Sequence, residues 1–189
     1  MRFDSEQPWV TPAGAPALAA DAVHVWRASL VLDDAAHDHA RRLLAPDERA
    51  RADRFLRPVH GRRFTAARAA LRQVLAQYLD AAPERISFEY TRQRKPYLPA
   101  GQNPREIQFN LSHSGDVAII AIVFGRDIGV DIEHMAPLRD WSGVAQRYFA
   151  PEEAAELQRL PDAERLTAFY RCWTRKEAYL KAGGDGLTR

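Results

Sequence analysis

Cysteine and lysine are the two residue types that this sequence nearly lacks. Its single cysteine, Cys172, excludes an intrachain disulfide and would leave a zinc cluster to scattered histidines. The first twenty residues form no secretory hydrophobic stretch and no membrane span, because two acids and three prolines interrupt them. We therefore expect a cytoplasmic protein without a membrane partner, and we interpret Cys172 as a core residue.

Lysine accounts for three of the twenty-seven basic residues, and the other twenty-four are arginines. An ammonium group can give up a proton, whereas a guanidinium stays protonated. Lys95, Lys176 and Lys181 therefore indicate places where the chain needs proton transfer or a compact positive charge.

The net charge of +2 is too small to indicate a nucleic-acid partner, but the charges are unevenly distributed. Between residues 41 and 72, ten arginines stand against three acids. Such a stretch can hold a polyanion. The alternative is a solvated helical face whose arginine stems pack over apolar neighbours.

Residues 1–21 are rich in proline and alanine, and we expect a weakly ordered lead-in. Hydrophobic periodicity predicts the regular elements that follow. Strands are predicted at 23–26, 86–90, 117–124 and 128–133, an extended segment at 95–99, and helices at 34–57, 61–80, 140–149, 151–160 and 162–182. The β-branched run 117–124 predicts a central strand buried on both faces, and the turn at 125–127 predicts a hairpin with 128–133.

A weak internal repeat has a period of 105 residues. Ala45-Pro46-Asp47-Glu48 recurs 105 positions later as Ala150-Pro151-Glu152-Glu153, and the strand at 23–26 recurs at 128–131. The matches keep the same order along the chain, which indicates a duplicated unit of strand, helix and strand.

The repeat divides the chain into two parts of unequal length. The first part, 22–126, and the second, 127–189, are predicted to be similar α+β halves. The second part has no counterpart of the strands within 86–124. We therefore expect that the second half is incomplete at its C-terminus, either because it is abbreviated or because the chain stops before its natural end.

Three carboxylates and a lysine lie where side-chain directions can be deduced from the sequence. Asp131 and Glu133 share one face of a strand, because residues two apart point the same way. Glu177 lies one turn after Trp173 on the apolar stripe of a helix, and Lys181 follows one turn later. Carboxylate oxygens with positions left for water and phosphate suit Mg²⁺. The alternative is an exposed strand end and a surface pair on the helix worth about 0.3 kcal/mol.

The segment from Phe109 to Asp116 precedes the buried strand and offers small hydroxyls, an imidazole and a glycine as donors to phosphate. A catalytic pair of Ser112 and His113 is the rival interpretation. Adjacent residues of an extended segment point in opposite directions, which argues against a hydrogen bond between these two side chains.

Three motifs in this order resemble the 4′-phosphopantetheinyl transferases of the Sfp type. They are Asn-Leu-Ser-His-Ser-Gly at 110–115, Gly-Val-Asp-Ile-Glu at 129–133, and Trp-Thr-Arg-Lys-Glu-Ala at 173–178 followed by Lys181, with Arg-Lys-Pro-Tyr at 94–97 in addition. The resemblance implies a pseudo-twofold fold of two similar α+β halves. It also implies transfer of 4′-phosphopantetheine from coenzyme A to a serine of an apo acyl or peptidyl carrier protein, with release of adenosine 3′,5′-bisphosphate.

The resemblance also implies roles for the acidic residues and one lysine. Asp131, Glu133 and Glu177 would bind Mg²⁺, or Mn²⁺ in its place, together with the pyrophosphate. Lys181 would contact the phosphates or protonate the leaving group. Displacement at phosphorus needs neutralised charge and a deprotonated serine, so Glu177 is also the candidate catalytic base, directly or through water.

The coenzyme A site is implied in the same way. Lys95, Ser112 and His113 would hold its 3′-phosphate end, and Asp131 and Lys181 would contact the cofactor near the metal. Arg51 falls at a position of a basic phosphate contact. The neighbouring basic position of the family is Glu48 here, which is a departure from the pattern.

Two other classes of function compete with this one. An arginine-rich helical module could bind nucleic acid, with the acidic cluster incidental; its affinity would survive loss of Asp131 and fall with salt. A Mg²⁺-dependent phosphohydrolase could use the same carboxylates. Under the transferase hypothesis we expect no nucleic-acid partner and, because both halves lie in one chain, a monomer.

Overall fold

The computed structural model describes residues 9, 10, 12 and 17–184. Within them, a three-stranded antiparallel sheet and a two-stranded hairpin combine with six α-helices, as expected for an α+β protein. Most of the predicted lead-in, 1–21, lies outside the described residues. No helix in the described part of the chain combines the length and apolar character needed to cross a membrane.

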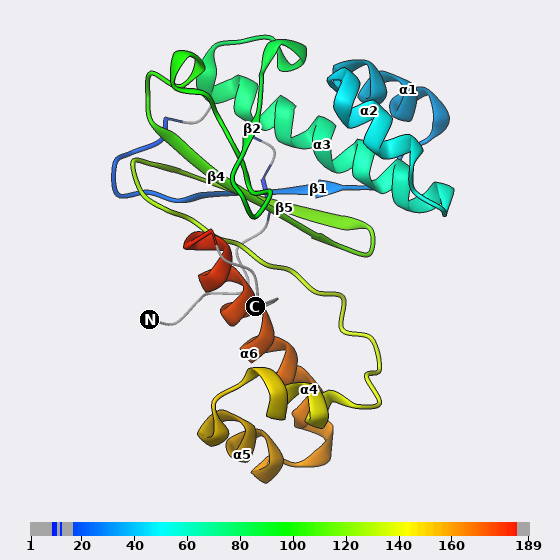
Figure 1. The fold of residues 1–189 in the computed structure, drawn as a ribbon, viewed down its shortest axis with the longest axis vertical. Helices are drawn as coiled ribbons and strands as arrows, with labels where there is room; N and C mark the ends of the chain where they lie inside the picture. Colours follow the sequence, from blue (N-terminus) through cyan, green and yellow to red (C-terminus); the bar gives the residue numbers. More distant parts are fainter. Residues whose placement is uncertain (1–8, 11, 13–16, 185–189) are drawn as a thin grey trace.

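The sheet has the strand order β1-β5-β4, with β1 at His24–Ser29, β4 at Ile107–Ser114 and β5 at Val117–Phe124. The predicted central strand is confirmed, because β5 pairs with β1 over six residues and with β4 over eight. Its Ile120 and Ile122 are fully buried beneath the long helix that crosses one face of the sheet (Figure 1).

This long helix is α3, at Pro58–Leu79. Leu71 and Leu75 on its inner side are fully buried in the main core against the sheet. The helix begins three residues before the predicted range 61–80, because a proline in the first helical turn needs no hydrogen-bond partner for its nitrogen.

The range 34–57, predicted as one helix, contains two. They are α1 at Asp34–Leu43 and α2 at Pro46–Asp53. Pro46 disfavours the helical conformation in Ala45 before it, so the first helix ends and a new one starts at the proline.

The predicted strand 86–90 is shorter in the structure. Only β2 at Glu89–Tyr90 pairs, with β3 at Pro96–Tyr97. The carbonyl of Ile86 and the N–H of Ser87 are bonded instead to side chains, of an arginine in α3 and of a glutamine in a 3-10 helix. Two 3-10 helices lie beside this hairpin, η1 at Pro83–Arg85 and η2 at Ala100–Gln102.

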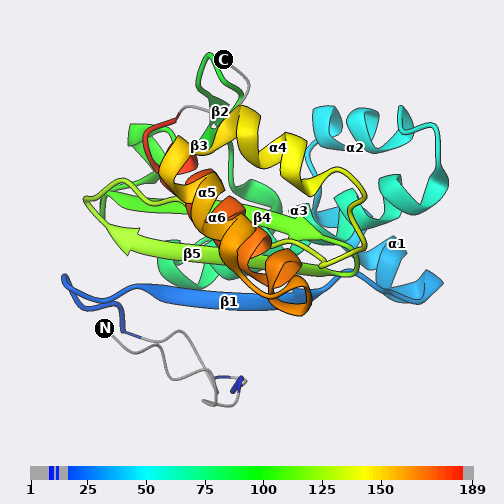
Figure 2. The same ribbon diagram turned by 90° about the horizontal axis from the view of Figure 1, so that it is seen from below.

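The second part of the chain supplies three helices where the sequence predicts them: α4 at Trp141–Tyr148, α5 at Pro151–Arg159 and α6 at Asp162–Ala182. They share a core in which the rings of Phe149 and Phe169 stack with centroids 5.4 Å apart. Figures 1 and 2 show that α6 leads from this helical cluster to the face of the sheet opposite α3.

The predicted strand 128–133 is wrong, and so is its predicted hairpin with β5. The hairpin partner of β5 is β4, through a turn in which Gly115 has φ +57°. The segment 128–133 is not part of any sheet, because the N–H groups that it turns toward β4 are bonded to side chains and not to the strand's carbonyls.

The helical parts of the two halves follow the repeat. Each has three helices in succession, and each second helix starts with the same cap: the carboxylate of Glu48 accepts the N–H of Ala45 at 2.9 Å, and Glu153 accepts that of Ala150 at 2.8 Å. All strands of the described residues lie before residue 125. The pseudo-twofold relation between the halves therefore stays a prediction.

Candidate active site

Lys181 joins the last helix to residues 128–134, which follow β5 at the start of the second half and are called the linking segment below. From α6, its Nζ donates to Oδ1 of Asp131 at 2.5 Å and to Oγ of Ser112 at 3.1 Å. The hydroxyl of Ser112 in turn donates to the same Oδ1 at 2.9 Å. Asp131 has only 3 % of its side chain exposed, so this ion pair is shielded from water and interacts more strongly than a surface pair. The structure thus brings together three residues that the sequence predicts for the site.

Side chains of β4 hold the linking segment in place. Asn110, Ser112 and Ser114 lie on one face of the strand, two residues apart. Their oxygens accept the N–H groups of residues 130, 132 and 134 at 2.9, 3.4 and 3.0 Å. This side-chain ladder, formed by Asn110, Ser112 and Ser114, explains why an alternating sequence is extended without pairing as a strand.

Gly129 sets the distance between the linking segment and α6. A Cβ at this position would lie 1.9 Å from the carbonyl oxygen of Ala178 and 2.4 Å from the nitrogen of Ala182. No side chain fits at such distances, so the segment approaches the helix backbone directly at this glycine. The close approach carries Asp131, two residues later, to Lys181.

The three predicted metal ligands influence one another without forming a closed site. Burial raises the pKa of Glu177, and the charges of Asp131 and Glu133 raise it further against the opposing effect of Lys181. Within the described ranges, no three acidic, histidine or cysteine side chains are grouped closely enough to hold a metal ion.

The residues nevertheless fit Mg²⁺ in chemistry. Oδ2 of Asp131 is buried and has no hydrogen-bond partner among the described residues. A buried carboxylate oxygen without a partner is costly unless a cation or a donor reaches it. Carboxylate oxygens are also the protein ligands that Mg²⁺ prefers.

Lys95 has a structural contact that the sequence did not reveal. Its Nζ donates to the carbonyls of Ile128, Lys181 and Ala182 at 3.2, 2.7 and 3.2 Å. An ammonium group has three protons, so all of its donors are used by backbone carbonyls. Two of these carbonyls lie at the C-terminal end of α6, where a positive charge is favourable. Burial lowers the pKa of Lys95, and Asp127 partly opposes this. The predicted contact of Lys95 with a phosphate stays a prediction.

A pocket of about 360 Å³ opens beside these residues, between α3, the β2–β3 hairpin and the end of α6. The site residues predicted from the sequence that line it are Arg51, Lys95, His113, Glu177 and Lys181. The lining therefore carries an excess of positive charge, which suits an anionic ligand.

His113 stands on β4 at the wall of this pocket. Surrounding protein atoms lower the pKa of His113, and the positive charges of Lys181 and Arg63 lower it further. Its side chain and that of Ser112 point to opposite faces of the strand, as the sequence predicts, and the hydroxyl of Ser112 is bonded elsewhere. This geometry argues against a Ser112–His113 dyad.

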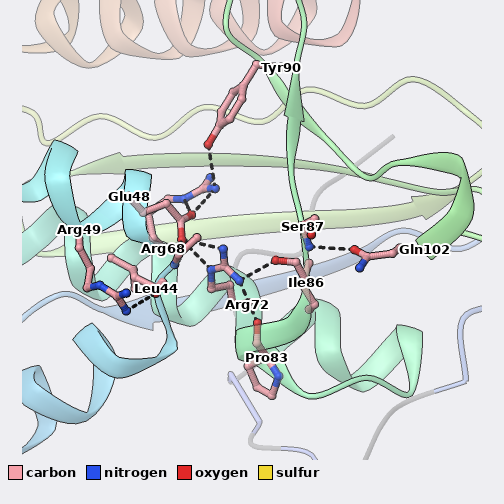
Figure 3. Close-up of polar contacts among 11 residues, drawn as sticks. Leu44, Glu48, Arg49, Arg68, Arg72, Pro83, Ile86, Ser87, Tyr90 and Gln102 are labelled. Atoms are coloured by element: carbon pink, nitrogen blue, oxygen red, sulfur yellow. Dashed lines mark hydrogen bonds and ion pairs between the residues drawn. The ribbon is translucent and has the colours of Figure 1, made fainter.

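Glu48 has a role that sequence reasoning missed. It is 2 % exposed, and its two carboxylate oxygens pair with Arg68 and Arg72 of α3 (Figure 3). Both guanidinium groups also lie over the ring of Phe88, with distances of 4.4 and 5.1 Å to its centroid. Arg68 reaches on to the hydroxyl of Tyr90 and lines the pocket. Glu48, which departs from the basic residue of the family pattern, is therefore the buried ion-pair partner of two arginines.

Other arginines of the basic stretch are also bonded within the fold. Arg41 pairs with Asp53, Arg62 with Asp34 and Arg63 with Asp116. The guanidinium of Arg51 lies 5.0 Å from the ring centroid of Phe64. The interpretation of packed arginine stems and surface pairs thus explains much of the cluster.

Comparisons with known proteins agree with the motifs. Residues 31–124 match the family described as 4′-phosphopantetheinyl transferase, N-terminal, and residues 127–189 match the 4′-phosphopantetheinyl transferase superfamily. The chain is 42% identical over 172 residues to the 4′-phosphopantetheinyl transferase HetI of Nostoc sp., an alignment that covers 91% of this chain and 73% of that protein.

Two further relatives are more distant. A 4′-phosphopantetheinyl transferase of Bacillus subtilis is 31% identical over 151 residues, which are 80% of this chain and 65% of the relative. The L-aminoadipate-semialdehyde dehydrogenase-phosphopantetheinyl transferase of Xenopus laevis is 32% identical over 154 residues, with 77% and 51% covered. The chain thus spans between about half and three quarters of the length of these relatives. The Sfp type stays a prediction, but the family is clear: this chain belongs to the 4′-phosphopantetheinyl transferases, which are transferase enzymes.

Proposed function

We propose that this chain transfers 4′-phosphopantetheine from coenzyme A to a serine of an apo acyl or peptidyl carrier protein, with Mg²⁺ as the metal. The serine oxygen forms a bond to the phosphorus that carries pantetheine, and the bond from this phosphorus to the bridging oxygen breaks. Adenosine 3′,5′-bisphosphate leaves with that oxygen. The observation that carries the proposal is the contact of Lys181 with Asp131 and Ser112 beside a basic pocket.

The basic pocket suits the nucleotide end of coenzyme A. Arg51, Lys95 and His113 are the contacts expected from the sequence, and Arg68 adds a fourth cationic or donor group to the same wall. Lys95 would contribute its positive charge, because its three donors are bonded to backbone carbonyls. Coenzyme A carries a pyrophosphate and a 3′-phosphate, so several positive groups are needed to replace its counterions. A neutral His113, favoured by its lowered pKa, still donates one N–H to a phosphate oxygen.

Lys181 is the proposed contact for the pyrophosphate. It contacts Asp131 and lines the pocket at the same time, so its ammonium lies between the proposed metal ligands and the proposed coenzyme A site. Charge that develops on the leaving oxygen is stabilised by a fixed cation, and the same ammonium can donate a proton to it.

Asp131, Glu133 and Glu177 are the proposed ligands of the metal. Bound Mg²⁺ would neutralise charge on the pyrophosphate and lower the pKa of a coordinated water. The unpartnered Oδ2 of Asp131 and the raised pKa of Glu177 support this assignment. Oδ2 has no donor among the described residues, and Glu177 is partly buried near the charges of Asp131 and Glu133.

Glu177 is the proposed base for the carrier serine. Its raised pKa lies closer to neutrality than that of an ordinary carboxyl, which makes it a better proton acceptor at physiological pH. The protonated Glu177 would pass the proton to solvent, because the side chain is half-buried and not sealed.

We further propose that the enzyme acts as a monomer in the cytoplasm. The site residues of one chain, from β4, the linking segment and α6, suffice to assemble the site, which supports a monomer. We place the boundary between the halves at 126 and 127, and the enzyme in the cytoplasm. The carrier protein and coenzyme A are its two partners.

Intact mass measurement after incubation with coenzyme A, Mg²⁺ and an apo carrier protein tests the proposal. We expect the carrier to gain the mass of phosphopantetheine, and Glu133→Ala to abolish the gain. Glu156→Ala is the matched control, since Glu156 is 71 % exposed on α5 and pairs with a neighbour on the same helix. The control should transfer at the unaltered rate.

Three outcomes would contradict the proposal. One is the absence of any mass gain from a protein that spans the full length of its relatives. The second is phosphate release from coenzyme A without a carrier, which would indicate a phosphohydrolase. The third is a salt-sensitive affinity for DNA or RNA that Asp131→Ala leaves intact.

A further inference from the structure

Ser114 makes with Glu133 the contact that Ser112 makes with Asp131. The hydroxyl of Ser114 donates to Oε2 of Glu133 at 2.9 Å and accepts the N–H of the next residue, His134, at 3.0 Å. The hydroxyl of Ser112 donates to Oδ1 of Asp131 at 2.9 Å and accepts the next N–H at 3.4 Å. The same arrangement therefore occurs twice: a serine of β4 donates to a carboxylate of the linking segment and accepts the N–H of the residue after that carboxylate. The two copies are two residues apart on β4 and on the linking segment.

The chemistry of a hydroxyl explains what this unit does. A serine side chain has one proton to donate and two lone pairs to accept with. In each serine, the oxygen accepts one N–H of the linking segment, and the single proton can engage only one carboxylate oxygen. The other oxygen is not bonded: Oδ2 of Asp131 is buried and has no partner among the described residues, and Oε1 of the exposed Glu133 forms no hydrogen bond or ion pair with them.

Asn110 provides an internal comparison. It is the first member of the side-chain ladder and accepts the N–H of Val130 at 2.9 Å. The residue before Val130 is Gly129, so no carboxylate lies opposite Asn110. Ser112 and Ser114, which each donate to a carboxylate, stand opposite Asp131 and Glu133. Asn110 stands where only the backbone is bonded.

Glu133 depends on its serine hydroxyl more than Asp131 does. It is exposed, and its side chain has one rotatable bond more than an aspartate. Asp131 is additionally held by Lys181, whereas the hydrogen bond from Ser114 is the contact that restrains Glu133 within the described residues. A ligand that is restrained before the metal arrives loses less freedom when it binds.

We propose that Ser114 is a positioning residue that holds one oxygen of Glu133 and leaves the other free for a divalent cation. The inference rests on the proposed function, because it assumes that Glu133 is a metal ligand. Removal of a group that is hydrogen-bonded to a metal ligand typically lowers metal affinity by tenfold or more. Ser114 contributes through Glu133, so its loss should weaken metal binding and leave the chemical step at saturating metal nearly unchanged.

Mn²⁺ serves as the probe, with its binding measured by electron paramagnetic resonance in the presence of coenzyme A. We expect Ser114→Ala to weaken Mn²⁺ binding about tenfold. Ser114→Thr keeps the hydroxyl and should bind within about twofold of the unaltered protein. Ser87→Ala is the matched control, since Ser87 is exposed and makes its contact through its backbone N–H. In turnover assays the half-saturating metal concentration should rise about tenfold in Ser114→Ala with kcat nearly constant.

The outcomes separate this inference from the function on which it rests. An unaltered protein that binds no Mn²⁺ with coenzyme A present would overturn the metal site and this inference together. Equal Mn²⁺ affinity of Ser114→Ala and the unaltered protein would overturn the inference alone. So would a Ser114→Thr variant as weak as Ser114→Ala, or a loss that lies in kcat and not in the metal concentration. Thermal unfolding of each variant shows whether it is folded.

Discussion

Lys181 and Asp131 are 50 positions apart in the sequence, and Nζ of the lysine lies 2.5 Å from Oδ1 of the aspartate. Only 3 % of the Asp131 side chain and 29 % of that of Lys181 are exposed. This largely buried ion pair therefore holds the end of α6 against the linking segment. The same two groups belong to the proposed active site, so here the stability of the fold and the geometry for catalysis depend on one contact.

Lys181→Met should destabilise the protein by about 1–3 kcal/mol, because a buried carboxylate loses a charged hydrogen-bond donor. Asp131→Asn should cost less, since the amide keeps a polar group toward Ser112. In the double variant the cost should be clearly smaller than the sum of the two single costs. Urea unfolding of the four proteins measures this coupling. The exposed pair of Glu156 and Arg159 is the control, with a coupling of about 0.5 kcal/mol or less. Strictly additive effects at 131 and 181 would show that the contact is not formed in solution.

Gly129→Ala should destabilise the protein by about 3 kcal/mol or more, because the added methyl would overlap the backbone of α6 at Ala178 and Ala182. Backbone atoms cannot move aside as a side chain can, so the linking segment must shift. Metal affinity should fall as well, since Asp131 moves with the segment. Gly101→Ala is the matched control, because a Cβ there meets no atom within 4 Å. Similar unfolding midpoints for the two variants would contradict the close approach.

Glu48→Gln should cost about 3–5 kcal/mol, because it removes the only negative charge beside two buried guanidinium groups, Arg68 and Arg72, among the residues that the structure describes. Asp47→Asn on the same helix is exposed and should change stability by less than about 0.5 kcal/mol. Chemical unfolding measures both. An equal effect of the two substitutions would mean that the buried ion pairs contribute nothing beyond a surface charge.

Much of the fold could be predicted because its signals are local. The run Val117 to Phe124 is β-branched along its whole length, and such a run is typical of a central strand. The helix 162–182 was predicted with its observed bounds, since an apolar stripe continues through it and glycines follow it. The carboxylates and Lys181 were identified from side-chain direction, and the structure places Lys181 on Asp131.

The errors share a different cause. The alternation at 128–133 predicted the extended backbone correctly, but nothing local shows that the partner is a row of side chains on β4 and not a strand. Glu48 looked like a missing basic residue, because its partners Arg68 and Arg72 lie 20 and 24 positions away. The sequence did contain one signal for the side-chain ladder, because Asn110, Ser112 and Ser114 are polar residues two positions apart. This spacing does not show which segment of the chain lies opposite β4, so the ladder could not be predicted from it.

Glu177→Gln should make the protein more stable at pH 7 while abolishing transfer. Burial and the charges of Asp131 and Glu133 raise the pKa of Glu177 in the folded state above its ordinary value of 4.5. The folded protein therefore binds this proton more tightly than the unfolded chain, and the ionised carboxylate costs folding free energy at neutral pH. Glutamine removes that cost.

The advantage of the Glu177→Gln variant should disappear as the pH falls to 4.5 and below, where the unaltered carboxyl takes up its proton in both states. Chemical unfolding between pH 4 and pH 8 measures the difference, with Glu164→Gln, exposed in the first turn of the same helix, as the control. A variant that is less stable at pH 7, or a difference that does not change with pH, would contradict a raised pKa of Glu177 in the folded protein. Addition of Mg²⁺ with coenzyme A should reverse the order of stability, because ligands that bind only the folded state stabilise it and the unaltered protein keeps all three proposed metal ligands.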